Sequence, residues 1–269
     1  MIRLGGGASH CLAATTTSWT QICCPLADRR SGRHTAAASG TVHNAGMDLL
    51  ISHRIWLMGQ DEQLLRPRAA GLRTAVTAAA LLDVISSGAA SWTESGTRVR
   101  TCPLPDGLPA LIQHRAERLE KAAGGKPLDT VYAIDALAPG VWDEVGSDAA
   151  LCGFATEVPR PIRRWMSPRH RPDTRLARTL KTHLREVIRS TDAITDPVDE
   201  AVLAVGWSAG VLDDLLSLTA FTDPDVVDPA RTHCQSSELV KRLDGPVTFL
   251  SSARIPPSSI GAGNSGSPT

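Results

Sequence analysis

The sequence predicts a mainly α-helical protein, a compact single-domain helical bundle with a small β-hairpin. Aromatic residues make up only 4% of the chain and the apolar fraction is rich in alanine, which favours helices over a β-sandwich. Most apolar stretches between residues 47 and 250 repeat with a helical period. Only one short segment has the pattern of a hairpin, so strands are expected to be a minor component.

Composition divides the 269 residues into three parts. Residues 1–46 lack helical or strand periodicity and hold four arginines against the single acid Asp28, so they cannot bury a core. We interpret them as a disordered leader, the alternatives being a transit peptide or a start assigned too early, with Met47 as the true first residue. Residues 47–250 are predicted to form the helical domain, and the Ser/Gly/Pro-rich residues 251–269 a disordered tail.

The first half of the domain is predicted from apolar runs and their stop signals. A short run from Asp48 to Met58 is followed by residues 69–85, which are apolar almost all round and so predict a buried central helix. Residues 92–102 carry the turn signals of a β-hairpin. An amphipathic helix through Leu108, Leu111, Ile112 and Leu119 should stop at Gly124, and residues 128–145 should carry another, broken near Pro139.

The segment from Pro159 to Arg189 is the one anomaly of charge, with ten basic residues against two acidic ones. A helix beginning at Pro172-Asp173 would place Arg178, Lys181, Arg185 and Arg189 beside an apolar face, which makes it a basic amphipathic helix. Such a stripe is most often a solvated face, and the competing interpretation is contact with anionic phosphates. The preceding stretch favours phosphates, because Arg163, Arg164 and Arg169 accompany Trp165 and Met166, two residues suited to a membrane interface.

Gly206-Trp207-Ser208-Ala209-Gly210 matches the elbow that presents a nucleophilic serine in α/β-hydrolases. Two observations favour a helix instead. Asp196, Pro197, Asp199 and Glu200 form a helix start, and apolar residues continue on one face through Leu216. The acid and histidine that a hydrolase needs are also poorly placed, since His233 is the only histidine after the serine. We therefore predict that Ser208 is buried on a helix.

Net charge, cysteine spacing and the length of apolar runs limit what kind of protein this can be. The 28 basic and 28 acidic residues balance, so affinity for nucleic acid or membrane must come from a local patch. The six cysteines give no C-x-x-C motif and are expected to be reduced thiols, and neither a metal site nor a cofactor is predicted. No apolar run approaches the roughly twenty residues that span a bilayer. The preference for arginine over lysine, with abundant alanine, suggests a bacterial source.

Taken in order, these segments resemble the Golgi phosphoprotein 3 family, particularly its short bacterial members. The resemblance covers about residues 47–245 and depends on the order of individually weak motifs. They are Asp48-Leu49-Leu50, Gly71-Leu72-Arg73 leading into Ala78-Ala79-Ala80-Leu81-Leu82, the hairpin, Arg163-Arg164-Trp165 after Gly153-Phe154, and Asp199 to Leu216. The family's central helix has the form L-A-L-x-H-A-x-x-L-L, which corresponds here to Leu203 to Leu212.

The resemblance implies a non-catalytic, mainly helical protein that binds a phosphoinositide headgroup, typically phosphatidylinositol 4-phosphate, at a membrane surface. The family's site combines a tryptophan and three arginines. Arg73 stands at the first arginine position, whereas Leu64 replaces the tryptophan, and Tyr132 and Asp135 replace the later arginines. The cationic cluster from Arg160 to Arg171, which includes Arg163, Arg164 and Arg169, is the candidate substitute, which leaves the selectivity for that lipid open.

We therefore expect a cytoplasmic, peripheral protein at the inner face of the membrane, with anionic phospholipid headgroups as ligands and proteins as further partners. Its predicted headgroup-binding residues are Arg73, Arg163, Arg164 and Arg169, with Trp165 and Met166 at the membrane interface. Two alternatives remain open. The helix, Arg73, the hairpin and the basic stripe also suggest a winged-helix nucleic-acid binder. Ser208 by itself suggests a serine hydrolase.

Overall fold

The computed structural model describes residues 49–61, 63–159, 169–190, 194–218 and 223–253. Within them the helices are α1 (Ile51–Gly59), α2 (Leu72–Ser86), α3 (Ala110–Ala123), α4 (Thr130–Leu137), α5 (Val141–Leu151), α6 (Thr174–Arg189), α7 (Pro197–Ser208), α8 (Leu212–Leu216), α9 (Pro224–Ser236) and α10 (Glu238–Ala253). The strands are β1 (Ala90–Trp92), β2 (Arg98–Thr101), β3 (Leu128–Asp129), β4 (Ala155–Val158) and β5 (Arg169–Pro172). The predictions made for residues 1–46 and for Arg163, Arg164, Trp165 and Met166 lie outside the described residues.

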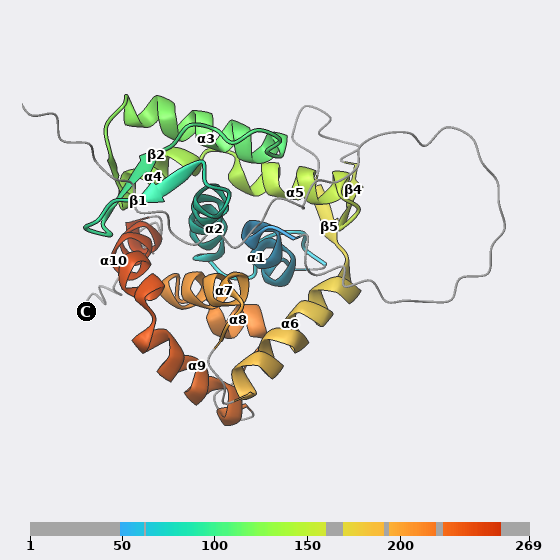
Figure 1. Ribbon diagram of the computed structural model, residues 1–269. Coiled ribbons are helices and arrows are strands. Elements are labelled where there is room, and N and C mark those ends of the chain that lie inside the picture. The colour runs from blue at the N-terminus through green and yellow to red at the C-terminus, as the bar shows by residue number, and fades with distance from the viewer. Residues whose placement is uncertain (1–48, 62, 160–168, 191–193, 219–222, 254–269) are drawn as a thin grey trace, which may run out of the picture. The chain divides into compact units, whose positions relative to one another are not determined.

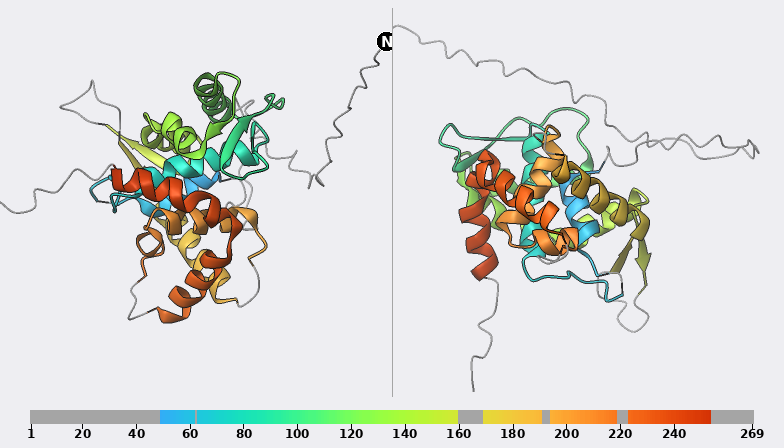
Figure 2. Two further views of the ribbon diagram at one scale, coloured as in Figure 1. Left: turned by 90° about the vertical axis from the view of Figure 1, so that its left-hand side faces the viewer. Right: turned by 90° about the horizontal axis from the view of Figure 1, so that it is seen from below.

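Helices α1 and α2 lie at the centre of the domain (Figure 1). All of α1 is buried, and so is all of α2 except Arg73, Ile85 and Ser86. Helices α3 to α5 and the β1–β3 sheet cover one side of this pair, while α6 to α9 cover the other (Figure 2). Apolar residues from both sides join one core, which confirms the predicted mainly α single domain.

The predicted hairpin is confirmed as β1 and β2, which pair antiparallel with Trp92 opposite Val99. Gly96 in its turn has a φ of +70°, a left-handed conformation that glycine adopts without steric cost. β3 pairs with the other edge of β2, so the hairpin is part of a three-stranded sheet. α3 ends as predicted at Gly124, and Pro139 separates α4 from α5.

The second half of the domain begins with a hairpin that the sequence did not predict. β4 and β5 pair antiparallel, and β5 consists of Arg169, His170, Arg171 and Pro172. Because this strand has no alternation of apolar and polar side chains, only burial reveals its two faces: His170 and Pro172 point inward and the two arginines are exposed. The predicted start of α6 is confirmed, since the Asp173 carboxylate accepts hydrogen bonds from two backbone N–H groups of the first turn.

The continuous helix predicted through Leu216 is wrong, because the chain breaks into α7 and α8 after Ser208. Gly210 has a φ of +64°, which ends the helical path and turns the chain. Gly206 then lets α8 approach α7 closely: a Cβ at this position would lie 3.0 Å from Leu215 Cδ1. Ser208 is buried on α7 as predicted, so no strand precedes it and the hydrolase elbow is not formed.

The end of the domain differs from the predicted boundary. α10 continues to Ala253, so Ser251 and Ser252 belong to a helix rather than to the tail. It packs against α2, α4 and α7, with Val240, Leu243 and Val247 in the core. The three cysteines among the described residues, Cys102, Cys152 and Cys234, are free thiols. Burial raises the pKa of Cys234 to about 12, so this thiol stays protonated and packs as an apolar group.

Candidate functional site: an arginine surface beside a buried polar core

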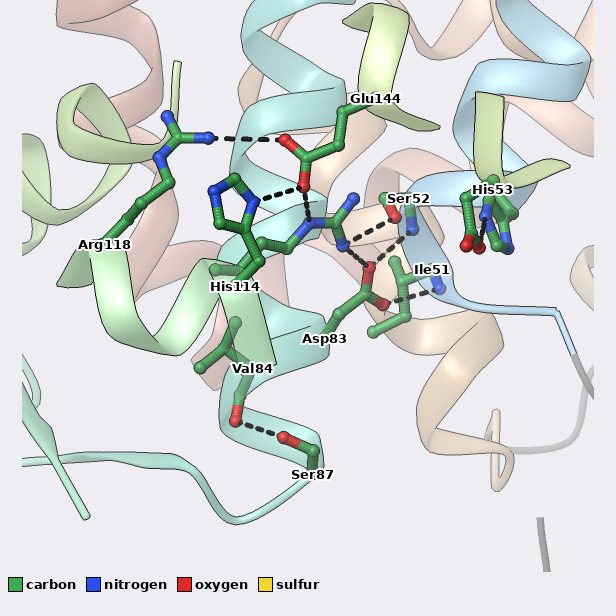
Figure 3. A network of polar contacts seen from close by, with 11 residues as sticks. Ile51, Ser52, His53, Asp83, Val84, Ser87, His114, Arg118 and Glu144 are labelled. Atoms are coloured by element: carbon green, nitrogen blue, oxygen red, sulfur yellow. Dashed lines mark hydrogen bonds and ion pairs between the residues drawn. The ribbon is translucent and has the colours of Figure 1, made fainter. Parts of the chain in front are cut away.

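A buried carboxylate holds the start of α1 in place (Figure 3). Asp83 on α2 accepts hydrogen bonds from the backbone N–H groups of Ile51 at 2.8 Å and Ser52 at 3.3 Å. Arg115 of α3 donates to the same carboxylate at 3.0 Å and to the Ser52 hydroxyl at 3.2 Å. Since no side chain of its own segment caps α1, Asp83 supplies the missing acceptor from a neighbouring helix.

Glu144 of α5 extends this network toward the surface (Figure 3). Its carboxylate lies 3.5 Å from the Arg115 Nε, 3.3 Å from the Arg118 Nη1 and 3.6 Å from the Nδ1 of His114. Arg118 also donates to the backbone carbonyls of Ala136 and Pro139. Arg115 and Arg118 therefore tie α3 to its neighbouring helices α2, α4 and α5.

A second buried ion pair connects α1 to helices in the other half of the domain. Asp199 in the first turn of α7 is only 1% exposed and accepts a hydrogen bond from Arg54 of α1 at 2.8 Å. Its second oxygen lies 2.8 Å from the Nε2 of His183 on α6. The sequence suggested a carboxylate that interacts with the positive end of its own helix. The structure shows in addition that Asp199 connects α1, α6 and α7.

The basic stripe of α6 is also engaged within the protein. Arg185 donates to the carbonyls of Leu216 at 3.0 Å and Ser217 at 2.8 Å, which are backbone acceptors at the end of α8. Lys181 donates to the Ser217 hydroxyl, and Arg189 pairs with Asp225 of α9 at 2.6 Å. The stripe was interpreted as a solvated face or a phosphate-binding face. Three of its four cations instead hold α8 and α9 against α6.

Arg73 is exposed at the start of α2, and its guanidinium carbon lies 5.5 Å from the centre of the Trp142 ring on α5. Trp142 packs on Trp56 of α1, with 6.1 Å between the ring centroids. Trp56 and His170 in turn meet at Gly146, where a Cβ would lie 3.0 Å from the first and 2.9 Å from the second. This sequence of contacts connects Arg73 to β5 through packed aromatic rings.

His170 is the inward residue of β5 in this packing. Burial lowers its pKa below the ordinary value of 6.5, while the charges of Glu157 and Asp143 act in the opposite direction. Its backbone carbonyl accepts a hydrogen bond from the buried Gln60 amide at 2.6 Å, which fastens β5 to the end of α1. The neighbours of His170 in the strand, Arg169 and Arg171, consequently face outward.

The loop between α1 and α2 lies against β5 (Figure 1). Arg169 donates to the carbonyl of Leu64 at 3.3 Å. Arg66 and Arg68 on the same loop are exposed, and Arg68 donates from Nε to the carbonyl of Gln60. Asp61 begins the same loop, and hydrogen bonds from the backbone N–H groups of Leu64 and Gln63, together with the charges of Arg68 and Arg66, lower its pKa.

We call the exposed side chains of Arg66, Arg73, Arg169 and Arg171 the arginine surface. None of the four forms an ion pair with a carboxylate among the residues that the structure describes. Each guanidinium group carries five N–H donors, and Arg169 gives one of them to the carbonyl of Leu64. The arrangement suits the planar, bidentate recognition of phosphate oxygens.

Two of the predicted site residues, Arg73 and Arg169, lie in the described part of the chain, and both are exposed. The packed rings that begin at Arg73 lead to His170, which lies on the other face of β5 from Arg169. Arg66 was not predicted as a site residue, and Arg171 was predicted only as a member of the cationic cluster from Arg160 to Arg171. The two-residue spacing of Arg169 and Arg171 places both on one face of β5. Of the positions matched to the resembled family's site, Leu64 and Tyr132 are exposed at 47% and 68%.

Two alternative interpretations meet obstacles in this geometry. A winged-helix protein inserts a recognition helix into a groove, but α2, the helix before the hairpin, is buried along most of its length. The Ser208 side chain is buried at the end of α7. Within the described part of the chain, no three histidine, cysteine or acidic side chains gather as a metal site would require.

Comparison of the sequence with protein-family models and with curated proteins finds no match. The resemblance to the Golgi phosphoprotein 3 family therefore stays a prediction, supported by the order of its motifs alone. Among the helices in the described ranges, none combines the length and apolar character that crossing a membrane requires.

Proposed function

We propose that this protein is a non-catalytic peripheral protein that binds anionic phospholipid headgroups through the arginine surface. One observation carries the proposal: Arg66, Arg73, Arg169 and Arg171 are exposed without a carboxylate partner among the described residues. Several other basic residues, among them Arg115, Arg185 and Arg189, are bound to carboxylates or carbonyls of the domain itself. Exposed guanidinium groups attract phosphate at a negatively charged membrane surface.

The packing behind the surface supports a binding role. Arg73 lies over Trp142, and Arg169 donates to the loop at Leu64, so both side chains are oriented before a ligand arrives. Orienting a flexible side chain in advance reduces the entropy lost on binding. A phosphoinositide carries more phosphate charge than other phospholipids. This chemistry agrees with phosphatidylinositol 4-phosphate, the lipid that the resemblance implies, and with action at the inner face of a membrane.

Liposome flotation tests the proposal directly. The variant Arg66→Ala/Arg169→Ala/Arg171→Ala removes three cations, each worth about 1 kcal/mol near an anionic surface, so binding should fall by roughly two orders of magnitude. Binding by the wild type should also weaken with added salt, because the Debye length is about 8 Å at physiological ionic strength.

The matched control removes the same charge elsewhere. Arg100, Lys121 and Lys126 are exposed around β2 and α3, so Arg100→Ala/Lys121→Ala/Lys126→Ala should bind vesicles nearly as the wild type does. An equal loss of vesicle binding in both variants would show that net charge alone attracts the protein to vesicles. Salt-dependent binding to duplex DNA without any vesicle binding would favour the nucleic-acid alternative.

A further inference from the structure

A cavity of about 720 Å³ lies between α3 and the chain at the end of β2, and this volume is typical of a site for a small organic molecule. The buried residues of its lining are Ala89 and Ala116, whose short side chains leave room between the two walls. The N–H of Cys102 donates to the carbonyl of Ala89 at 2.9 Å, and the Thr101 hydroxyl donates to the Glu120 carboxylate of α3. These hydrogen bonds fix the walls of the cavity relative to each other.

Three cations line this cavity: Arg100 of β2, Lys121 of α3, and Lys126, which follows the end of α3. All three are exposed, and none is paired with a carboxylate within the described ranges. Glu117 and Glu120 line the cavity as well, so it carries three positive charges against two negative ones. Cations suit the phosphate of a ligand, while carboxylates accept hydrogen bonds from its hydroxyl or amino groups.

The same cavity also has an apolar wall. Leu104, which is 45% exposed, lines it together with the exposed Pro103. An apolar ring of a ligand gains free energy when it covers such side chains and removes them from water. Charged groups and apolar surface are thus combined in one concave site, which is the usual composition of a small-molecule site.

We propose that this cavity binds a small soluble organic phosphate of the nucleoside monophosphate type. The phosphate meets Arg100, Lys121 and Lys126, while the sugar hydroxyls donate to the carboxylates of α3. The base lies against Leu104. This site shares no residue with the arginine surface, so the inference does not depend on the proposed lipid binding.

Shape and charge favour a soluble ligand over a bilayer at this place. A concave site encloses most of the surface of a small ligand, whereas a bilayer presents its headgroups on a broad face. Glu117 and Glu120 are both exposed, and they repel a negatively charged membrane. The cations of the cavity can therefore hold a soluble phosphate and still contribute little to vesicle binding.

The thiol of Cys102 provides a reporter for the test, because it is free and lines the cavity. Adenosine monophosphate at millimolar concentration should slow the alkylation of Cys102 by iodoacetamide, followed by mass spectrometry of the peptides. Cys152 is a free, exposed thiol outside the cavity lining, and its alkylation rate should not change. Adenosine and inorganic phosphate each lack part of the contacts, so they should protect Cys102 at least about tenfold more weakly.

Charge removal tests the assignment of the phosphate contacts. Lys121→Ala/Lys126→Ala should weaken the protection by adenosine monophosphate at least about tenfold, because charged hydrogen bonds are lost. The matched control Arg231→Ala/Lys241→Ala removes two cations from exposed ion pairs of α9 and α10, and it should protect Cys102 as the wild type does.

Three results would overturn the inference: no protection of Cys102 in the wild type, equal protection of Cys152, or full protection in Lys121→Ala/Lys126→Ala. Vesicle flotation keeps this test separate from the proposed function. Arg100→Ala/Lys121→Ala/Lys126→Ala should lose protection by the nucleotide and keep vesicle binding. Failure of the wild type to bind vesicles would remove the lipid proposal and leave the nucleotide result standing.

Discussion

The basic stripe of α6 and the arginine surface are both rich in arginine, but their cations have different partners within the protein. Arg185 and Arg189 of the stripe bind carbonyls at the end of α8 and a carboxylate of α9. Arg73 and Arg169 are directed by an aromatic ring and a loop carbonyl, and no described carboxylate neutralises them. The density of positive charge in a segment therefore does not tell whether that charge is available to a ligand.

The two regions differ in the hydrogen-bond acceptors that lie next to their cations. α8 has only five residues and ends at Ser217, whose φ of +53° closes the helix in a left-handed conformation. The last carbonyls of a helix have no partner within it, so a cation that reaches them is stabilised strongly. Arg185 fills this role, and the stripe becomes part of the fold.

The largest expected effect concerns the ion pair behind α6. Asp199→Ala leaves Arg54 buried without its carboxylate, which should reduce the free energy of unfolding by about 3–5 kcal/mol in urea titrations. The double variant Arg54→Met/Asp199→Leu should recover most of the loss, since it removes the buried positive charge as well. A loss below about 1 kcal/mol for Asp199→Ala would mean that this pair does not hold α1, α6 and α7 together.

A smaller effect tests the packing beneath the arginine surface. Gly146→Ala would place a Cβ 2.9 Å from the His170 Nδ1 and 3.0 Å from Trp56, so the two side chains must shift. Overpacking of this kind costs about 1–3 kcal/mol, and the displaced β5 should bind vesicles less well. Ser147→Ala, at an exposed position of the same helix, serves as the control. Unchanged stability and binding in Gly146→Ala would show that Arg169 does not depend on this contact.

The smallest expected effect is a pH dependence from His170. Because burial lowers its pKa in the folded protein, the unfolded chain binds the proton more readily. Stability should be full above the ordinary pKa of 6.5 and decline as the pH falls through that value toward the folded pKa. His170→Gln should flatten this part of the profile of unfolding free energy against pH. A wild-type profile of unfolding free energy that is flat over this pH range would show that His170 does not make stability depend on pH.

Local signals were enough to predict much of the fold. The start of α7 at Asp196 and Pro197, the buried α2 and the turn at Gly96 all follow from residues that are neighbours in the sequence. The break after Ser208 was missed, because periodic apolar residues continue across Gly210. The β4–β5 hairpin was missed because its polar strand is defined by contacts with α5 and with Gln60 at the end of α1.

The candidate site was less predictable for the same physical reason. Arg185 and Ser217 are 32 positions apart, so the sequence could not show that the stripe is occupied. Arg73 was identified from a resemblance and Arg169 from charge alone, yet their connection through Trp142, Trp56 and His170 required the three-dimensional packing. Arg66 was overlooked because Asp61 and Glu62 balance the charge of its loop in the sequence.

The most direct test of the difference between the two basic regions measures vesicle binding and urea unfolding for one triple variant of each. Arg66→Ala/Arg169→Ala/Arg171→Ala should lose roughly a hundredfold in binding and keep its unfolding free energy within about 0.5 kcal/mol. Lys181→Ala/Arg185→Ala/Arg189→Ala should lose about 2 kcal/mol of stability, chiefly from Arg185, and keep most of its binding. The opposite pattern, with binding lost from the stripe and stability lost from the arginine surface, would contradict this assignment.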